Sequence, residues 1–290
     1  MALGTDQFTA ADLAVYIPEM WGDAINDFYK SKLVLATHFT DRSDELMGGG
    51  DILHTGNLTE MTTNAKANGS QVTLQSPTET EIQLNVNTWV ETSFMVEDDI
   101  KAQWLNSLSL QERYARNAAY SVAKALDTAL AGLISGFSQS VGTAGTAVTD
   151  AVVRQAIATL AGNDVDLDEC VFVFHPTVAW EEIQGVDRYA LVQNTAGADP
   201  VLQGAVASIY GIPVLQSSNI AVNGGGGFFN FLAHKDAIHF ATAALDGAGS
   251  SGVRVQTNYI PEYLGHLTTA DIKYGVVENR DNAGVQILSN

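Results

Sequence analysis

Residues 81–91 have the sequence EIQLNVNTWVE, and the alternation of apolar and polar side chains in this stretch decides the expected fold. A period of two with β-branched residues is typical of a strand that buries one face. The turn sequence Asn68-Gly69-Ser70 precedes it, so we expect the second limb of an extended two-stranded arm over about residues 51–91. The apolar face of that limb comprises Ile82, Leu84, Val86 and Val90.

The arm is expected to bury its apolar face outside its own subunit. An isolated two-stranded arm is marginal in water, so this face needs a partner. We expect a neighbouring copy of the chain to supply it, which favours assembly rather than catalysis. The N-terminal segment, residues 1–43, has a short amphipathic helix with aromatic anchors but too few residues for its own core. The expected interface residues are therefore Ile82, Leu84, Val86, Val90, Trp21 and Phe28.

Charge and cysteine content exclude several classes of function. The chain has 33 acidic and 14 basic residues, a formal charge of -19, which argues against nucleic-acid binding through phosphate neutralisation and against attraction to an anionic membrane. Only 16% of residues are charged, and a sparsely charged surface suits burial against other copies. Cys170 is the single cysteine, so no disulfide can form within one chain, which fits a reducing cytoplasm. We expect no secretory signal and no membrane span.

The remaining segments predict an ordered series of helices and strands. A short helix after Glu97 and a long helix over about residues 108–134 are expected from apolar residues repeating every three to four positions. A Gly/Thr-rich boundary at 141–149 separates them from a compact α/β segment. There Thr149 is the expected N-cap of a helix, and 170–174, CVFVF, is an expected buried strand. From residue 238 onward, strand patterns return.

None of the chemical motifs that we tested is complete. The acidic run 164–169 begins like a calcium loop but lacks the required glycine and the bidentate glutamate, so an acidic turn between helix and strand is the better interpretation. His234 and His239 lie outside any zinc-binding motif. Cys170 is expected to be a buried apolar residue. Glycines 224–227 are not followed by the Lys-Ser/Thr of a P-loop. We therefore predict no catalytic, cofactor or metal site. Lys66, the only lysine of the arm, leaves covalent cross-linking between copies as an alternative.

The order of these parts resembles the major capsid proteins of tailed bacteriophages, a Hong Kong-type fold shared with encapsulins. Five short stretches support the resemblance: 111–134 as a spine helix, GAVASIYGIPV at 204–214, SSN at 217–219, HKDAI at 234–238 and ADIKYG at 270–275. The resemblance implies an α+β fold with an N-terminal arm (1–43), an extended β-hairpin E-loop (44–92), a P-domain with a long spine helix (93–145), an α/β A-domain (146–237), and return strands of the P-domain with a C-terminal A-domain strand (238–290).

The resemblance also implies a function. Such a chain would be a coat protein that self-assembles as hexamers and pentamers into an icosahedral shell around the double-stranded DNA genome, without sequence-specific DNA contacts. A separate scaffolding protein and a portal are the other implied partners, with assembly in the host cytoplasm and a final location in the virion capsid. No cofactor, membrane or catalytic activity is implied. The alternatives are an encapsulin-like nanocompartment shell and a cytoplasmic α/β enzyme.

Overall fold

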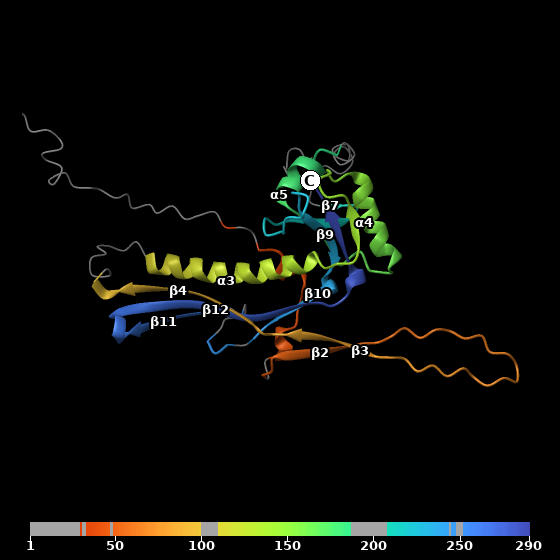
Figure 1. Ribbon diagram of the computed structural model, residues 1–290, viewed down its shortest axis with the longest axis horizontal. Helices are drawn as coiled ribbons and strands as arrows, with labels where there is room; N and C mark the ends of the chain where they lie inside the picture. Colours follow the sequence, from red (N-terminus) through yellow and green to blue (C-terminus); the bar gives the residue numbers. More distant parts are fainter. Residues whose placement is uncertain are drawn as a thin grey trace, which may run out of the picture. The chain divides into compact units, whose positions relative to one another are not determined.

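The computed structural model describes residues 30, 33–46, 49–99, 110–186, 208–243, 245–247 and 252–290 (Figure 1). Trp21, Phe28 and the helix expected in the N-terminal segment lie outside these residues. Of the short helix expected after Glu97, only residues 98–99 are described, and they are helical. Within the described part, no helix is long and apolar enough to cross a membrane.

The first sheet, here called the β12 sheet, is built around one long strand. Strand β12 (Gly265–Glu278) pairs along one side with β4 (Thr88–Glu97), and along the other with β11 (Arg254–Ile260) and then β10 (Ile238–Thr242). The short strand β1 (Thr40–Asp41) adds to β10 in parallel, whereas the other pairs are antiparallel. Residues far apart in sequence therefore meet on β12.

One face of the β12 sheet is covered by the long helix α3 (Leu110–Ile134), as Figure 1 shows. The buried positions of α3 recur every four residues, which confirms the helix expected over about 108–134. They pack against alternate residues of β12, which include Ala270, Ile272 and Tyr274. The buried apolar residues of α3 are Ala118, Val122, Leu126, Leu130, Ala131 and Ile134.

The second sheet, here called the β6 sheet, forms the core of the α/β segment. Its strand order is β5 (Ser140–Gly142), β13 (Gly284–Leu288), β9 (Phe229–His234), β6 (Cys170–Phe174), β8 (Ile212–Gln216) and β7 (Ser208–Ile209). All five residues of β6 are buried, which confirms the strand expected from the CVFVF run. Val173 faces the core that contains α3, whereas Phe172 and Phe174 face a second core. Burial on both faces explains the unbroken apolar run.

Short helices complete the β6 sheet and the connections between the sheets. Helix α4 (Asp150–Gly162) buries Val153, Ala156 and Leu160 in the second core, and Thr149 stands at its N-cap in an extended conformation without a side-chain cap bond. The remaining short elements are α1 (Leu35–His38), η2 (Ser43–Leu46), α5 (Pro176–Val178), the π-helical turn η3 (Ala179–Ile183), η5 (Lys235–Ala237), η6 (Pro261–Tyr263) and η7 (Asp281–Ala283).

The arm divides at a point that the sequence pattern does not reveal. Strands β2 (Ile52–Asn57) and β3 (Thr80–Asn85) pair antiparallel, with Leu53 opposite Leu84. The strand expected to continue through residue 91 instead ends at Asn85, and the chain enters the β12 sheet as β4 at Thr88. Residues 81–91 therefore belong to two different sheets. The pairing with the first limb ends with the bond from the backbone N–H of Val86 to the carbonyl of Asp51.

Candidate assembly surfaces and the joint between the sheets

The apolar face of the arm's second limb is buried within its own subunit, which corrects the expectation that a neighbour would cover it. Leu84 is only 2% exposed, and Val86 is fully buried with Leu46 and Ala241 in a third core. Val90 packs against the core under α3, and Ile82 is half-buried. Leu84, Val86 and Val90 therefore contribute to the fold of the chain that carries them.

The apolar residues of the arm pack on the face of the β12 sheet opposite α3. Alternate residues of β12 point to opposite faces, so Val276 packs towards α3 and Val277 packs with the arm. Gly275 allows the two backbones to approach, because a Cβ there would lie 2.1 Å from the carbonyl oxygen of Asn85. Glycine permits such close contact where any side chain would clash.

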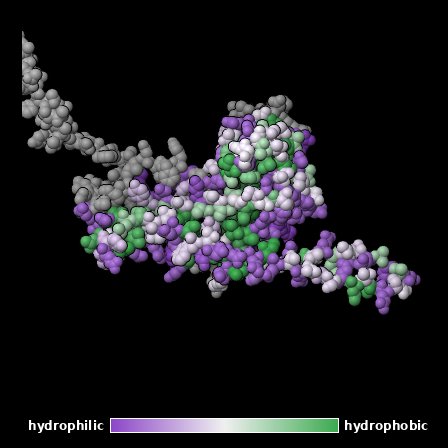
Figure 2. Space-filling model, in the orientation of Figure 1, coloured by the Kyte–Doolittle hydropathy of each residue, from purple (hydrophilic) through white to green (hydrophobic). Residues whose placement is uncertain are grey.

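The part of the arm that does lack a core is its loop, residues 58–79, here called the arm loop. It joins β2 to β3 in Figure 1, and Figure 2 shows hydrophobic residues on its surface. Leu58 is 79% exposed and Leu74 is 89% exposed, and Met61 and Val72 are exposed as well. Burying apolar area stabilises by roughly 25 cal/mol per Å². Contact of these exposed side chains with another surface would therefore be favourable.

Few hydrogen bonds hold the arm loop across its two limbs. The Thr59 hydroxyl donates to the carbonyl of Thr78, and the backbone N–H of Thr62 donates to Gln75 Oε1 at 3.1 Å. A turn with Gly69 at φ +81° closes the tip, where the N–H of Ser70 bonds to the carbonyl of Ala67. Most backbone groups in the loop lie outside any ladder, so another chain can pair with them.

A second exposed apolar group lies at the hairpin between β11 and β12. Tyr259, Tyr263 and Leu264 are all exposed, and Leu264 adopts a left-handed conformation with φ +46°. A non-glycine residue with positive φ costs about 1 kcal/mol or more and persists where surrounding structure requires it. The Tyr259 hydroxyl donates to Asp98 at 3.0 Å, and this bond raises the pKa of Tyr259.

An exposed tryptophan is held in place on the face of the β12 sheet opposite α3. The ring of Trp89 is 64% exposed, yet its Nε1–H donates to Asp271 Oδ2 at 2.9 Å. Arg254 donates to both oxygens of Asp271, at 2.9 and 2.6 Å, and holds the pKa of this buried carboxyl below its usual range. A large aromatic side chain with a fixed orientation is suited to a contact surface, because little entropy is lost on docking.

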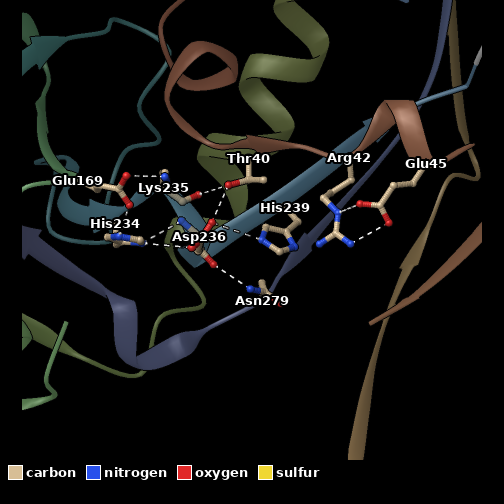
Figure 3. A network of polar contacts seen from close by, with 9 residues as sticks. All are labelled: Thr40, Arg42, Glu45, Glu169, His234, Lys235, Asp236, His239 and Asn279. Atoms are coloured by element: carbon tan, nitrogen blue, oxygen red, sulfur yellow. Dashed lines mark hydrogen bonds and ion pairs between the residues drawn. The ribbon is translucent and has the colours of Figure 1, made fainter. Parts of the chain in front are cut away.

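Figure 3 shows a polar cluster at the joint, residues 234–238, where β9 of one sheet leads into β10 of the other. Asp236 is central: its Oδ1 accepts the Thr40 hydroxyl at 2.8 Å, and its carbonyl accepts Asn279 Nδ2 at 3.0 Å. Lys235 Nζ lies 2.5 Å from Glu169, and His234 Nε2 lies 3.2 Å from the same carboxylate. The cluster thus ties β1, the start of β6 and the end of β12 to the joint.

The two histidines considered in the sequence both approach Asp236 rather than a shared metal position. His234 Nδ1 and His239 Nε2 lie 3.8 and 3.9 Å from its carboxylate oxygens. Burial, and then the charge of Arg42, lower the pKa of His239. In the described residues, no group of three or more His, Cys, Asp or Glu side chains is arranged to hold a metal ion.

The other residues considered for chemistry have structural surroundings. Cys170 is buried, and this burial raises its pKa to about 12, so the reactive thiolate is disfavoured. In the acidic run, Asp166 Oδ1 accepts the backbone N–H of Asp168 at 3.0 Å, the bond of a turn that leads into β6. These contacts give both residue groups a structural role in the turn and strand that follow one another here.

Solved structures with the same fold come from several phages. No family model matches the chain, and no curated protein does. A chain of Mycobacterium phage Che8 superposes with a TM-score of 0.77 at 20% identity, over 94% of this chain and 97% of that one. The capsid structure of Cyanophage P-SCSP1u gives 0.77 at 12% identity, over 99% and 97%. The mature capsid of bacteriophage PhiM1 gives 0.72 at 14% identity, over 94% and 92%.

The chain has the fold of tailed-phage capsid proteins. The α+β class expected from the sequence is thereby confirmed, as is the resemblance drawn from the order of parts. The capsid fold covers nearly all of the chain, so the arm, the long helix and both sheets belong to it. The boundaries expected for its domains remain predictions. The resemblance implies an E-loop over 44–92, whereas β4 from Thr88 onward pairs in the β12 sheet.

Proposed function

We propose that this chain is the major capsid protein of a tailed phage. The observation that carries the proposal is the likeness to phage capsid structures over nearly the full length of both chains. Copies would assemble as hexamers and pentamers into an icosahedral shell that encloses double-stranded DNA. The role is structural, and no step of catalysis is needed for it.

The arm loop supports self-assembly as the mode of action. It presents exposed apolar side chains, among them Leu58 and Leu74, on a segment with few internal hydrogen bonds. Obligate interfaces between copies bury about 2,000 Å² or more, and repeated contacts in a closed shell add through avidity. We infer that the arm loop covers part of a neighbouring copy. The interface role assigned to Leu84, Val86 and Val90 is not carried into this proposal, whereas Ile82, Trp21 and Phe28 remain candidates.

The negative charge of the chain fits a shell that encloses DNA without binding its phosphates tightly. A formal charge of -19 leaves few cations for phosphate contacts, so the packaged genome would be held without sequence-specific binding. We further propose a separate scaffolding protein and a portal as partners, assembly in the host cytoplasm, and a final place in the virion capsid.

Electron microscopy and sedimentation of the purified chain, with and without a co-expressed scaffolding protein, test this function. Closed shells or capsomer rings are the expected result. A compact monomer under both conditions would overturn the proposal. Shells that enclose a protein cargo instead of DNA in the producing cells would favour the encapsulin-like alternative.

A matched pair of variants tests the arm loop itself. Leu74→Asn removes an exposed apolar contact, and Thr73→Asn changes the adjacent exposed residue without removing apolar area. We expect Leu74→Asn to lower shell yield several-fold with unchanged unfolding of the unassembled chain, because an exposed side chain contributes little to the fold. Thr73→Asn should assemble normally. Equal yields for both variants would remove Leu74 from the interface.

A further inference from the structure

Asp127, near the middle of α3, is a fully buried carboxylate with 0% exposure. In the described part of the chain its hydrogen-bond donors are all neutral: two backbone amides and one side-chain amide. Burying a carboxylate is costly unless hydrogen bonds replace its hydration, and an apolar residue at this position would bury more cheaply. A charge in the middle of an apolar helix face therefore calls for an explanation other than packing.

One oxygen of Asp127 caps a different helix. Its Oδ1 accepts the backbone N–H of Leu35 at 2.9 Å and that of Ala36 at 3.4 Å. These are the first amides of α1, and Val34 at its N-cap position makes no side-chain cap bond. The first amides of a helix have no partner within the helix, so an outside acceptor must satisfy them when they are buried. Asp127 supplies that acceptor from 92 residues away.

The other oxygen of Asp127 reaches towards the β6 sheet. Its Oδ2 accepts Asn219 Nδ2 at 2.8 Å, and Asn219 lies in the turn after β8, where its own N–H bonds to Ser217 Oγ at 3.2 Å. One carboxylate thus joins α1, α3 and the turn after β8. Oδ1 therefore accepts hydrogen bonds from α1, and Oδ2 accepts one from the turn after β8.

The segment that Asp127 caps continues into the body of the subunit. Val34, Leu35 and Phe39 are buried in the core under α3, and Phe39 stacks on Phe231 with ring centroids 6.1 Å apart. The chain then pairs as β1 with β10. Asp127 therefore stands at the beginning of this docked segment, residues 34–41.

We propose that Asp127 is the positioning residue of the docked segment, residues 34–41. By capping α1 from α3 and holding Asn219, it fixes where residues 34–41 dock on the subunit body, and assembly depends on this docking. We call Asp127 with its bonds to Leu35, Ala36 and Asn219 the latch. This inference rests on the proposed function, since it assigns the latch a role in assembly.

Hydrogen exchange on the full-length chain tests the latch separately from assembly. In Asp127→Ala, the amides of Leu35 and Ala36 should exchange at least about tenfold faster, the factor expected when a hydrogen bond to a charged group is lost. Asn219→Ala should speed exchange only in the turn after β8. Glu112→Gln is the control, because it makes a carboxylate-to-amide change on the same helix at an exposed residue.

Asp127→Asn supplies the isosteric test and serves if Asp127→Ala does not fold. Its amide oxygen can still accept from the α1 amides, and its NH2 can donate to Asn219 if that side-chain amide turns by 180°. A neutral acceptor binds more weakly than a carboxylate, so we expect exchange at Leu35 and Ala36 to be faster than in the wild type and slower than in Asp127→Ala. Wild-type exchange at the α1 amides in Asp127→Ala, or in Asp127→Asn where the alanine variant does not fold, would overturn the latch. So would faster exchange spread evenly over α3 and both sheets, which would mark an ordinary core residue.

Shell yield then tests the assembly role. We expect Asp127→Ala to reduce shell yield at least several-fold while Glu112→Gln and the wild type assemble alike. Normal shells from Asp127→Ala, despite fast exchange at Leu35 and Ala36, would refute the positioning role and leave the proposed function standing. Absence of shells from the wild type would instead count against the proposed function, while the exchange data would still decide on the latch.

Discussion

Single side chains divide the arm into a folded base and an exposed loop. Leu84 and Leu74 are both leucines of the arm, yet the first is buried in the third core and the second is exposed to solvent. The same substitution should therefore act on different properties at the two positions. This pair separates subunit stability from assembly at the scale of one residue.

Leu84→Asp should destabilise the unassembled subunit by about 3–5 kcal/mol, because it removes a buried leucine and places a carboxylate among Leu46, Val86 and Ala241. Urea unfolding monitored by circular dichroism measures the change. Leu74→Asp is the matched control and should leave the unfolding midpoint within experimental error. Similar midpoints for both variants would mean that the third core does not contribute to stability.

The lowered pKa of His239 makes the free energy of unfolding depend on pH. Burial and the charges of Arg42 and Arg280 lower its pKa, while the facing carboxylates of Asp236 and Glu45 oppose the shift. Burial also lowers the pKa of His38. When the folded pKa of a histidine is lowered, the stability it contributes is complete above the unfolded value of 6.5 and is lost as pH falls below it.

We therefore expect the urea concentration at the unfolding midpoint to decrease as the pH is lowered from about 7.5 to about 5.5, the range in which histidine titrates. His239→Gln should reduce this slope because the side chain no longer takes up a proton. Asp271 acts in a separate range: Arg254 lowers its pKa, so its contribution is lost only at more acidic pH. An unchanged slope in His239→Gln would show that His239 does not control the transition.

At the scale of elements, the predictions that succeeded depended on contiguous residues. The long helix α3 and the buried strand β6 were expected because their periods are visible within one segment. The division of residues 81–91 between two sheets is not visible in that segment. It depends on Gly275, far along the chain, because this glycine lets Asn85 approach β12. Likewise α1 owes its cap to Asp127, and no local pattern in residues 34–38 shows that.

Gly275 and Gly132 give a matched test of this packing. Gly275→Ala should destabilise the chain by about 1–3 kcal/mol, because the new methyl group would overlap the backbone of Asn85 and push the arm base from the sheet. Gly132→Ala in α3 meets no atom within 4 Å and should stabilise by about 0.5–1 kcal/mol through helix propensity. Thermal unfolding compares the two variants. If both substitutions raised, or both lowered, the unfolding temperature, the packing argument would be contradicted.

At the scale of the whole molecule, two opposing effects act on assembly. Copies that each carry a formal charge of -19 repel one another, whereas the exposed apolar side chains of the arm loop favour contact. Salt screens the repulsion and leaves apolar burial intact or stronger, so its effect on shell yield shows which kind of contact dominates. A shell held mainly by ion pairs would respond in the opposite direction.

We therefore expect the yield of shells from unassembled subunits to rise between about 0.01 M and about 1 M NaCl, over which the Debye length falls from about 30 Å to about 3 Å. Sedimentation measures the assembled fraction, and an equal osmolality of sucrose controls for solute effects without screening. Leu74→Asn should remain defective at every salt concentration, because screening cannot restore a lost apolar contact. A wild-type yield that falls with salt would show that ion pairs hold the shell and that the arm loop is secondary.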